Sequence, residues 1–328
     1  MWLSNRLGWN RSPISDAPTI ADELAERTGT PVVAPPVRAC NPGPVIRQML
    51  TSAALNPLPS PRALAARVLP GTGRSIADQR VLITGGSSGV GEAAARRLAE
   101  LGAEVILVAR GAEGLESVRD DIRAADGRAH AFPANLTDPD DVDRLVAQVL
   151  ADIGPIDVLV NNAGRSIRRT VEDSLDRFHD FERTMAINYF GATRLTLALL
   201  PSMLERGDGH IVNVATWGVP SGVMPKFAAY HASKAAVEAF GRSLGAEVAD
   251  RGIAVSTLHF PLVRTPMIAP TADYDTMPTL RPEEAAEWFV TAIRTRPVEL
   301  MPTYAEALRV IGFFSPGLAN ALVLRGRI

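Results

Sequence analysis

Three features that would point to particular classes of protein are scarce in this sequence of 328 residues. It contains a single cysteine, Cys40, so no disulfide can form within the chain, and a reducing, cytoplasmic setting is the simplest interpretation. Its 34 basic and 36 acidic side chains give a net charge of −2, without the basic excess that nucleic-acid binding normally leaves. We therefore expect a cytoplasmic protein with no nucleic-acid partner.

Long apolar runs are the third scarce feature. No stretch of about 18 uninterrupted apolar residues occurs, so we expect no membrane-spanning helix. The first residues, MWLSNRLGWNRSP, also lack the apolar core of a secretory signal. The segment 311–324 is nevertheless apolar, with Arg325 and Arg327 beside it, which leaves peripheral contact with a membrane surface open. We identify no residues as metal ligands.

Composition divides the chain into three regions. Residues 1–76 are rich in proline and hold only short helical patterns, which indicates an N-terminal extension and not an independent domain. Residues 77–296 alternate short runs of β-branched residues with helical stretches, as a single α/β domain would. Residues 297–328 form an apolar, partly helical tail.

The middle region carries a regular alternation of predicted elements. Strands are predicted at 81–84, 104–109, 129–134, 156–162, 210–215 and 253–259. Helical patterns separate most of them, at 91–102, 140–154 and 235–252, and a further helix begins at Pro282. This order predicts an α/β protein with a doubly wound parallel sheet, a Rossmann fold.

A glycine-rich turn follows the first predicted strand directly. The sequence TGGSSGVG runs from Thr84 to Gly91 and leads into a helix. A glycine turn at a helix N-terminus presents backbone N–H groups to an anion and lets a pyrophosphate approach closely. The cofactor-binding residues predicted here are Gly85, Ser87, Ser88, Gly89, Val90 and Gly91. The alternative is a tight turn without a ligand.

The end of the second predicted strand indicates which nucleotide binds. Folds that bind NAD usually place an acid about 20 residues past the loop, whereas an arginine suits the 2′-phosphate of NADP. This strand ends at Ala109 and Arg110, without an acid. We therefore predict NADP(H) as cofactor, with a solvated charge at Arg110 as the alternative.

Four motifs occur together in one order: TGGSSGVG, NNAG at 161–164, Asn188 within MAINYFG, and YHASK at 230–234. The combination resembles the classical short-chain dehydrogenase/reductase (SDR) superfamily over about residues 78–290. The resemblance implies further cofactor-binding residues: Asn135, Leu136, Asn162, Ala163, Gly164, Tyr230, Lys234, Val263 and Thr265. Two departures are Phe260-Pro261, where the superfamily usually has Pro-Gly, and Asn135, where it commonly has an acid.

Tyr230 and Lys234 lie four residues apart, so they are neighbours on one face of a helix. A tyrosine normally titrates near pH 10, and a nearby ammonium should lower that pKa. Tyr230 would then exchange a proton with a substrate oxygen during hydride transfer. The resemblance implies that Lys234 also binds the nicotinamide ribose, that Asn188 holds a water in a proton relay, and that Thr216 replaces the usual serine.

A narrower resemblance points to the substrate. The segment NNAGRSIRRTVEDSLDRFHDFERTMAINYFGATRLTL, together with FPLVRTPMIAPT at 260–271, is similar to bacterial fatty acyl-CoA reductases, which reduce long-chain acyl-CoA to fatty aldehyde with NADPH. Hydride would attack the thioester directly, because Cys40 precedes the catalytic domain and cannot serve as an acyl carrier there. Residues 267–280 would form a lid, in which Met267, Ile268 and Met277 line an acyl channel or simply pack within the loop. Arg165, Arg168 and Arg169 either meet CoA phosphates or remain solvated.

Other interpretations stay open. A ketone, steroid or hydroxyacyl lipid could occupy the same site. A non-catalytic NADP-binding protein, whose N-terminal segment recruits a partner, is a more distant alternative. The resemblance also implies a homo-oligomer, a dimer or tetramer, formed through the helices around Asn188 and Tyr230.

Overall fold

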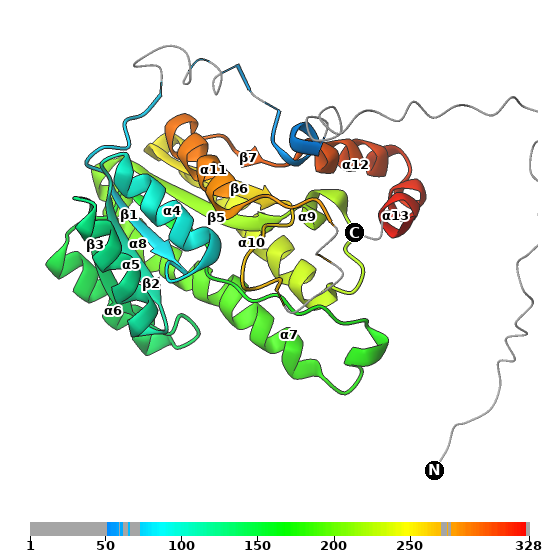
Figure 1. Ribbon diagram of the computed structural model, residues 1–328, viewed down its shortest axis with the longest axis horizontal. Coiled ribbons are helices and arrows are strands. Elements are labelled where there is room, and N and C mark those ends of the chain that lie inside the picture. Colours follow the sequence, from blue (N-terminus) through cyan, green and yellow to red (C-terminus); the bar gives the residue numbers. More distant parts are fainter. Residues whose placement is uncertain are drawn as a thin grey trace, which may run out of the picture. The chain divides into compact units, whose positions relative to one another are not determined.

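The computed structural model describes residues 51–58, 60, 61, 65, 73–269, 274 and 277–325 (Figure 1). These residues belong to one compact unit, Arg47–Ile328. Most of the predicted N-terminal extension, including Cys40, lies outside the described residues.

A seven-stranded parallel sheet forms the centre of this unit, in the order β3-β2-β1-β4-β5-β6-β7. The strands are β1 (Arg80–Thr84), β2 (Glu104–Ala109), β3 (Arg128–Pro133), β4 (Val158–Asn161), β5 (Gly209–Thr216), β6 (Ile253–Phe260) and β7 (Glu299–Leu300). The chain runs outward from β1 in both directions, so the predicted doubly wound fold is confirmed. All six predicted strands are present, and the sequence analysis missed the two-residue strand β7, which pairs with β6 through Leu258 and Leu300.

Helices cover both faces of the sheet (Figure 1). One face packs against α4 (Gly89–Glu100), α5 (Ala112–Ala124) and α11 (Pro282–Thr295), and the other against α6 (Pro139–Asp152), α8 (Ala192–Arg206) and α10 (Ala228–Val248). Side chains alternate between the faces along each strand: Val81 and Ile83 pack in the first layer, and Leu82 packs in the second. The β-branched runs in the sequence therefore form strands that are buried on both sides.

Two helix starts follow from capping chemistry. Asp138 precedes α6, and its side chain accepts hydrogen bonds from the N–H groups of Asp140 and Asp141, at 3.0 and 3.4 Å. Helix α11 begins at Pro282, as predicted, and the N–H of Arg281 donates to Oε2 of Glu284 at 2.8 Å.

Shorter elements connect these layers. They are the 3₁₀ turns η1 (Glu172–Ser174) and η3 (Ala249–Arg251), the helices α7 (Phe178–Met185) and α9 (Gly218–Ser221), and the π-helix η2 (Ala186–Gly191). None of the helices in the described part of the chain combines the length and apolar composition needed to cross a bilayer.

The C-terminal region continues beyond the sheet as α12 (Thr303–Phe314) and α13 (Pro316–Arg325). Ala305 and Val323 on these helices pack with Trp217 in a small separate core. A short helical segment at 51–55 lies beside α12 (Figure 1). After this segment, the carbonyl of Asn56 accepts from Oγ1 of Thr303 at 2.9 Å. The part of the N-terminal extension around Asn56 is thus held against the start of α12.

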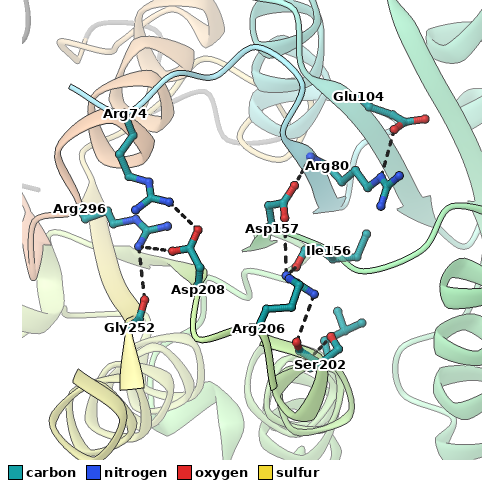
Figure 2. Close-up of polar contacts among 11 residues, drawn as sticks. Arg74, Arg80, Glu104, Ile156, Asp157, Ser202, Arg206, Asp208, Gly252 and Arg296 are labelled. Atoms are coloured by element: carbon teal, nitrogen blue, oxygen red, sulfur yellow. Dashed lines mark hydrogen bonds and ion pairs between the residues drawn. The ribbon is translucent and has the colours of Figure 1, made fainter. Parts of the chain in front are cut away.

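Charged side chains gather where the strands begin (Figure 2). Asp208, just before β5, binds Arg74 at 2.5 Å and Arg296 at 2.9 Å. Asp157, just before β4, accepts from the N–H of Arg80 at 2.9 Å. These contacts join the chain at and before the start of β1 to the turns that precede β4 and β5.

Candidate active site

A cavity of about 470 Å³ lies at the opposite edge, where the strands end. Its walls come from the glycine loop, the NNAG segment, the end of β5, α10 and the loop after β6. The lining residues are Gly85, Ser88, Gly89, Val90, Asn162, Ala163, Gly164, Ser166, Arg168, Val214, Ala215, Thr216, Trp217, Met224, Phe227, Tyr230, Lys234, Phe260, Pro261, Leu262, Val263, Thr265, Pro266, Met267, Ile268 and Tyr274. A doubly wound sheet places ligands at this edge.

The glycine loop has the geometry that a bound pyrophosphate needs. Gly85 and Gly89 have φ angles of +69° and +59°, which disfavour other residues. A Cβ on Gly91 would lie 2.2 Å from the carbonyl oxygen of Gly85, so only glycine lets α4 approach the loop this closely. Ser88 caps α4 without a side-chain hydrogen bond to its N–H groups, and it lines the cavity. These residues fit a dinucleotide phosphate at the start of α4.

The NNAG segment is tied to the glycine loop through Thr84. The Thr84 hydroxyl oxygen accepts from the N–H groups of Asn162 and Ala163, each at 2.9 Å. Nδ2 of Asn162 donates to the carbonyl of Thr84 at 2.8 Å. The two cofactor motifs, far apart in sequence, therefore form one rigid wall of the cavity.

Lys234 lies on α10 and is 3% exposed. Its Nζ donates to the carbonyl of Val214 at 2.7 Å, which draws the ammonium toward the end of β5. Burial lowers the pKa of Lys234 to about 8. The ammonium is thus close to its point of deprotonation under ordinary conditions.

Tyr230 lies one helical turn earlier and also faces the cavity. The phenol is half-buried, and burial raises its pKa to about 12, although a side-chain hydrogen bond with Thr216 acts in the opposite direction. The expected lowering of this pKa does not occur in the protein alone, because desolvation of the phenol is the largest contribution and only the hydrogen bond with Thr216 opposes it. The phenol consequently keeps its proton at neutral pH, as a proton donor must.

Asn188 is 1% exposed and lies in the π-helix η2, a distortion that often occurs at functional sites. Its Oδ1 accepts from the N–H of Arg165 at 2.7 Å, and its Nδ2 donates to the carbonyl of Arg165 at 3.0 Å. Nδ2 also donates to Oγ of Ser233 at 2.9 Å, and Ser233 donates to the carbonyl of Tyr230 at 2.7 Å. Asn188 therefore braces α10 against the loop that follows NNAG.

Gly164 separates Asn188 from Lys234. A Cβ at this glycine would lie 3.0 Å from Oδ1 of Asn188 and 3.3 Å from Nζ of Lys234. The structure thus brings together Tyr230, Lys234, Thr216 and Asn188. Ser233, which the sequence analysis missed, connects two of them and lies within the YHASK motif itself.

Part of the cavity lining is apolar. Trp217, Met224 and Phe227 line it, and none of them was predicted, although Trp217 directly follows Thr216. Met267 and Ile268 also line the cavity, whereas Met277 is not among its lining residues. Within the predicted lid, residues 270–273, 275 and 276 lie outside the described residues.

The three arginines singled out in the sequence have different surroundings. Arg168 lines the cavity, and its guanidinium lies 5.7 Å from the centre of the Tyr274 ring. Arg169 pairs with the buried carboxylate of Asp180 at 3.3 Å. The backbone of Arg165 is held by Asn188.

Five predicted cofactor residues lie outside the cavity lining. Arg110 is exposed directly after β2, and Ser87 packs near Gly114. Gly91 lies inside α4, Asn135 accepts from Oγ1 of Thr137 at 2.8 Å, and Leu136 is buried. Their roles toward a cofactor stay predictions.

Comparison with known proteins identifies the family. Residues 79–275 match the short chain dehydrogenase family. The chain belongs to that family. It is 46% identical over 280 residues to a protein named fatty acyl-CoA reductase from Mycobacterium tuberculosis, which covers 85% of this chain and 95% of that protein. It is 49% identical over 245 residues to a fatty acyl-CoA reductase of Acinetobacter baylyi, covering 75% of this chain and 83% of that protein.

Solved structures of short-chain dehydrogenases share the fold. An actinorhodin polyketide ketoreductase variant with NADPH aligns with a TM-score of 0.62 at 31% identity, covering 70% of this chain and 97% of that one. A 3-ketoacyl-(acyl-carrier-protein) reductase from Brucella melitensis with NADH also gives 0.62, at 32% identity, covering 67% and 92%. The chain is thus an oxidoreductase of a family that binds nicotinamide cofactors.

Proposed function

We propose that this short-chain dehydrogenase reduces the thioester carbonyl of a long-chain acyl-CoA to a fatty aldehyde, using NADPH. The observation that carries the proposal is the cavity itself. Its phosphate-binding loop and its proton donor meet an apolar wall formed by Trp217, Met224, Phe227, Met267 and Ile268. The names of the two reductases from M. tuberculosis and A. baylyi support the substrate class.

In this proposal the dinucleotide lies along the glycine loop and the NNAG segment. When bound, NADPH supplies a hydride to the substrate carbonyl. Lys234 binds the nicotinamide ribose, and Asn188 holds a water that supplies protons to Lys234. Val263 and Thr265 in the loop after β6, both of which line the cavity, would also contact the cofactor.

Tyr230 and Thr216 act on the substrate oxygen. Both donate hydrogen bonds to the oxygen as negative charge develops on it, and Tyr230 transfers its proton. The raised pKa of Tyr230 keeps that proton available until the oxygen becomes basic. The resulting hemithioacetal collapses to aldehyde and CoA.

The experiment that tests this function follows NADPH absorbance with purified protein and palmitoyl-CoA, a long-chain aldehyde or a panel of ketones as substrate. Oxidation of NADPH with release of free CoA, both lost in Tyr230→Phe, is the expected result. Turnover with ketones alone would discard the acyl-CoA substrate and keep the reaction class. Binding of NADPH without turnover of any carbonyl would favour the non-catalytic alternative.

The preference for NADPH is attributed to Arg110, which lies at the end of β2 where no acid is present. Replacing Arg110 with Gln should reduce kcat/KM for NADPH by roughly 10-fold while changing that for NADH little. Arg119→Gln on the following helix is the matched control. An equal loss for both nucleotides would contradict this assignment.

The position of Arg168 in the cavity wall makes it the candidate for a CoA phosphate among the three arginines. Arg168→Gln should then raise KM for palmitoyl-CoA several-fold without raising KM for palmitaldehyde, which lacks phosphates. Arg183→Gln on α7 serves as the control. Equal changes for the two substrates would show that Arg168 only shapes the cavity.

We also expect a cytoplasmic homo-oligomer that contacts lipid surfaces peripherally. Exposed Phe190 and Leu197 lie on η2 and α8, beside the site, and suit self-association. Phe313 and Phe314 are 83% and 80% exposed at the end of α12 and suit a membrane surface. Light scattering and vesicle flotation, with Phe313→Ser/Phe314→Ser as control, test the two expectations separately.

A further inference from the structure

Three potential metal ligands converge behind the active site. Glu238 comes from α10, His259 from β6 and Glu299 from β7, and one ligand atom of each lies within 4.8 Å of the others. Nε2 of His259 lies 3.9 Å from Oε2 of Glu299, and the histidine is 0% exposed. The cluster is separate from the cavity, whose lining contains none of the three residues.

The hydrogen bonding of this cluster is incomplete. Among the described residues, the buried side-chain atoms that have no hydrogen-bond partner include Nε2 of His259 and Oε2 of Glu238. Buried polar atoms are normally paired, so two such atoms in one cluster call for an explanation.

The orientation of the His259 imidazole shows which kind of group could pair with its Nε2. Nδ1 of His259 lies 3.4 Å from the carbonyl oxygen of Thr216, which can only accept a hydrogen bond. Nδ1 therefore carries the ring proton, and Nε2 presents a lone pair. That lone pair faces two carboxylates, which are also electron-pair donors. Three electron-pair donors that face one point are stabilised by a shared proton or by a cation between them.

We propose that Glu238, His259 and Glu299 form a divalent-cation site, with Zn²⁺ as the best-fitting ion. One imidazole nitrogen and two carboxylates are zinc ligands, and three protein ligands with a water complete a tetrahedral site. Two carboxylates and a neutral imidazole balance the charge of the ion. A ligand imidazole must be neutral, and the proton on Nδ1 leaves Nε2 free to coordinate the ion.

Two neighbouring arginines affect how tightly the site would bind a cation. Arg309 holds Oε1 of Glu299 at 2.5 Å, which leaves Oε2 turned to His259. Arg242 lies 3.7 Å from that same Oε2, and its side chain is 55% exposed. Arg242 therefore competes with the cation but can turn into water when the cation binds.

An ion here would act on the active site through two elements. His259 contacts the carbonyl of Thr216, and Glu238 follows Lys234 by one turn of α10. Binding would join α10, β6 and β7 and hold these positions relative to one another. The ion would be structural, because the cluster lies outside the cavity.

The test uses the full chain, stripped with a chelator and dialysed against Zn²⁺, with elemental analysis and thermal unfolding as readouts. We expect one Zn²⁺ per chain and a Tm increase of roughly 4–8 °C at saturating zinc. Glu238→Gln and His259→Gln should each weaken binding at least roughly 30-fold, while Glu247→Gln, an exposed acid on the same helix, should not.

A variant that is expected to bind zinc more tightly tests the proposal even if Glu238→Gln or His259→Gln folds poorly. Arg242→Gln removes the competing cation and should tighten zinc binding several-fold. No uptake by the wild-type chain would overturn the proposal and leave a shared proton as the occupant of the cluster. Uptake unchanged in Glu238→Gln but lost in His130→Gln or His179→Gln would overturn it too, because it would place the ion at another His–acid pair.

Discussion

The charged side chains at the two edges of the sheet differ in their burial and in their partners. Where the strands begin, charged side chains pair with carboxylates, as Arg74 and Arg296 do with Asp208, and only the Arg296 side chain of these three is largely buried (Figure 2). Where the strands end, Lys234 is buried and binds a backbone carbonyl instead of a carboxylate. At the edge where the strands begin, each of these charges thus has a partner of opposite sign, whereas Lys234 at the other edge has no carboxylate partner.

The two kinds of charged group contribute differently to stability and to catalysis. Exposed ion pairs contribute little each, because water and salt compete with the partner. An isolated buried charge costs stability, but its pKa moves, as that of Lys234 does to about 8. Substitutions at the carboxyl edge should therefore change activity strongly, and those at the amino edge should change stability slightly.

The largest effect is expected for Tyr230→Phe. The variant removes the proton donor and keeps the ring, which packs 6.2 Å from that of Phe227. We expect kcat to fall roughly 10²- to 10⁴-fold, with thermal stability nearly unchanged. Steady-state kinetics and calorimetry on the same preparation measure both.

A matched control for this variant is Tyr189→Phe, which also removes a phenol but lies on η2, outside the cavity lining. It should keep its activity. If Tyr230→Phe retained more than about a tenth of wild-type kcat, proton donation would have to come from another group.

Gly91→Ala should have the next largest effect. The added methyl would lie 2.2 Å from the carbonyl oxygen of Gly85, so α4 and the loop must move apart. We expect dinucleotide affinity to fall at least roughly 10-fold and unfolding free energy to fall by about 1–3 kcal/mol. Gly111→Ala, where no atom lies within 4 Å of the added methyl, is the control for both measurements.

Most of the residues at the edge where the strands end could be predicted from the sequence, because the motifs that contain them are short and local. Strand, glycine turn and helix follow one another between Arg80 and Glu100, and Tyr230 and Lys234 are one turn apart. Local spacing also identified the start of α11 at Pro282. Each of these features depends on residues that are close in the chain.

What the sequence did not predict depends on contacts between distant segments. The strand β7 has two residues and is recognisable only by its pairing with β6. The cluster of Glu238, His259 and Glu299 forms from three separate elements without a spacing pattern. The pKa of Tyr230 was expected to fall because the pair was considered without its surroundings, and burial reverses the direction.

Lys234→Met should lower activity and yet stabilise the fold. The pKa of Lys234 in the folded protein, about 8, lies below the ordinary lysine value of 10.5, so the unfolded chain holds this proton more tightly. The resulting penalty is complete below pH 8 and disappears as the pH rises to 10.5. The variant should therefore gain up to about 3 kcal/mol at pH 7 and progressively less toward higher pH.

Denaturant titrations of wild type and Lys234→Met from pH 7 to 9.5 measure this gain. The range stops below pH 10, where Tyr230 begins to act with the opposite sign, because its folded pKa is raised. A gain that does not shrink with pH would trace to packing of the methionine and not to the buried charge.

The smallest effect is expected at the amino edge. Asp208→Asn removes the carboxylate between Arg74 and Arg296 but keeps the size of the side chain, which is 45% exposed. We expect a loss of about 1 kcal/mol or less in unfolding free energy, reduced further by high salt, and no change in kcat. Chemical denaturation at low and high salt, with steady-state kinetics, measures both quantities. A loss of several kcal/mol, or a change in kcat, would show that this edge is coupled to the active site and that the division between the two edges is wrong.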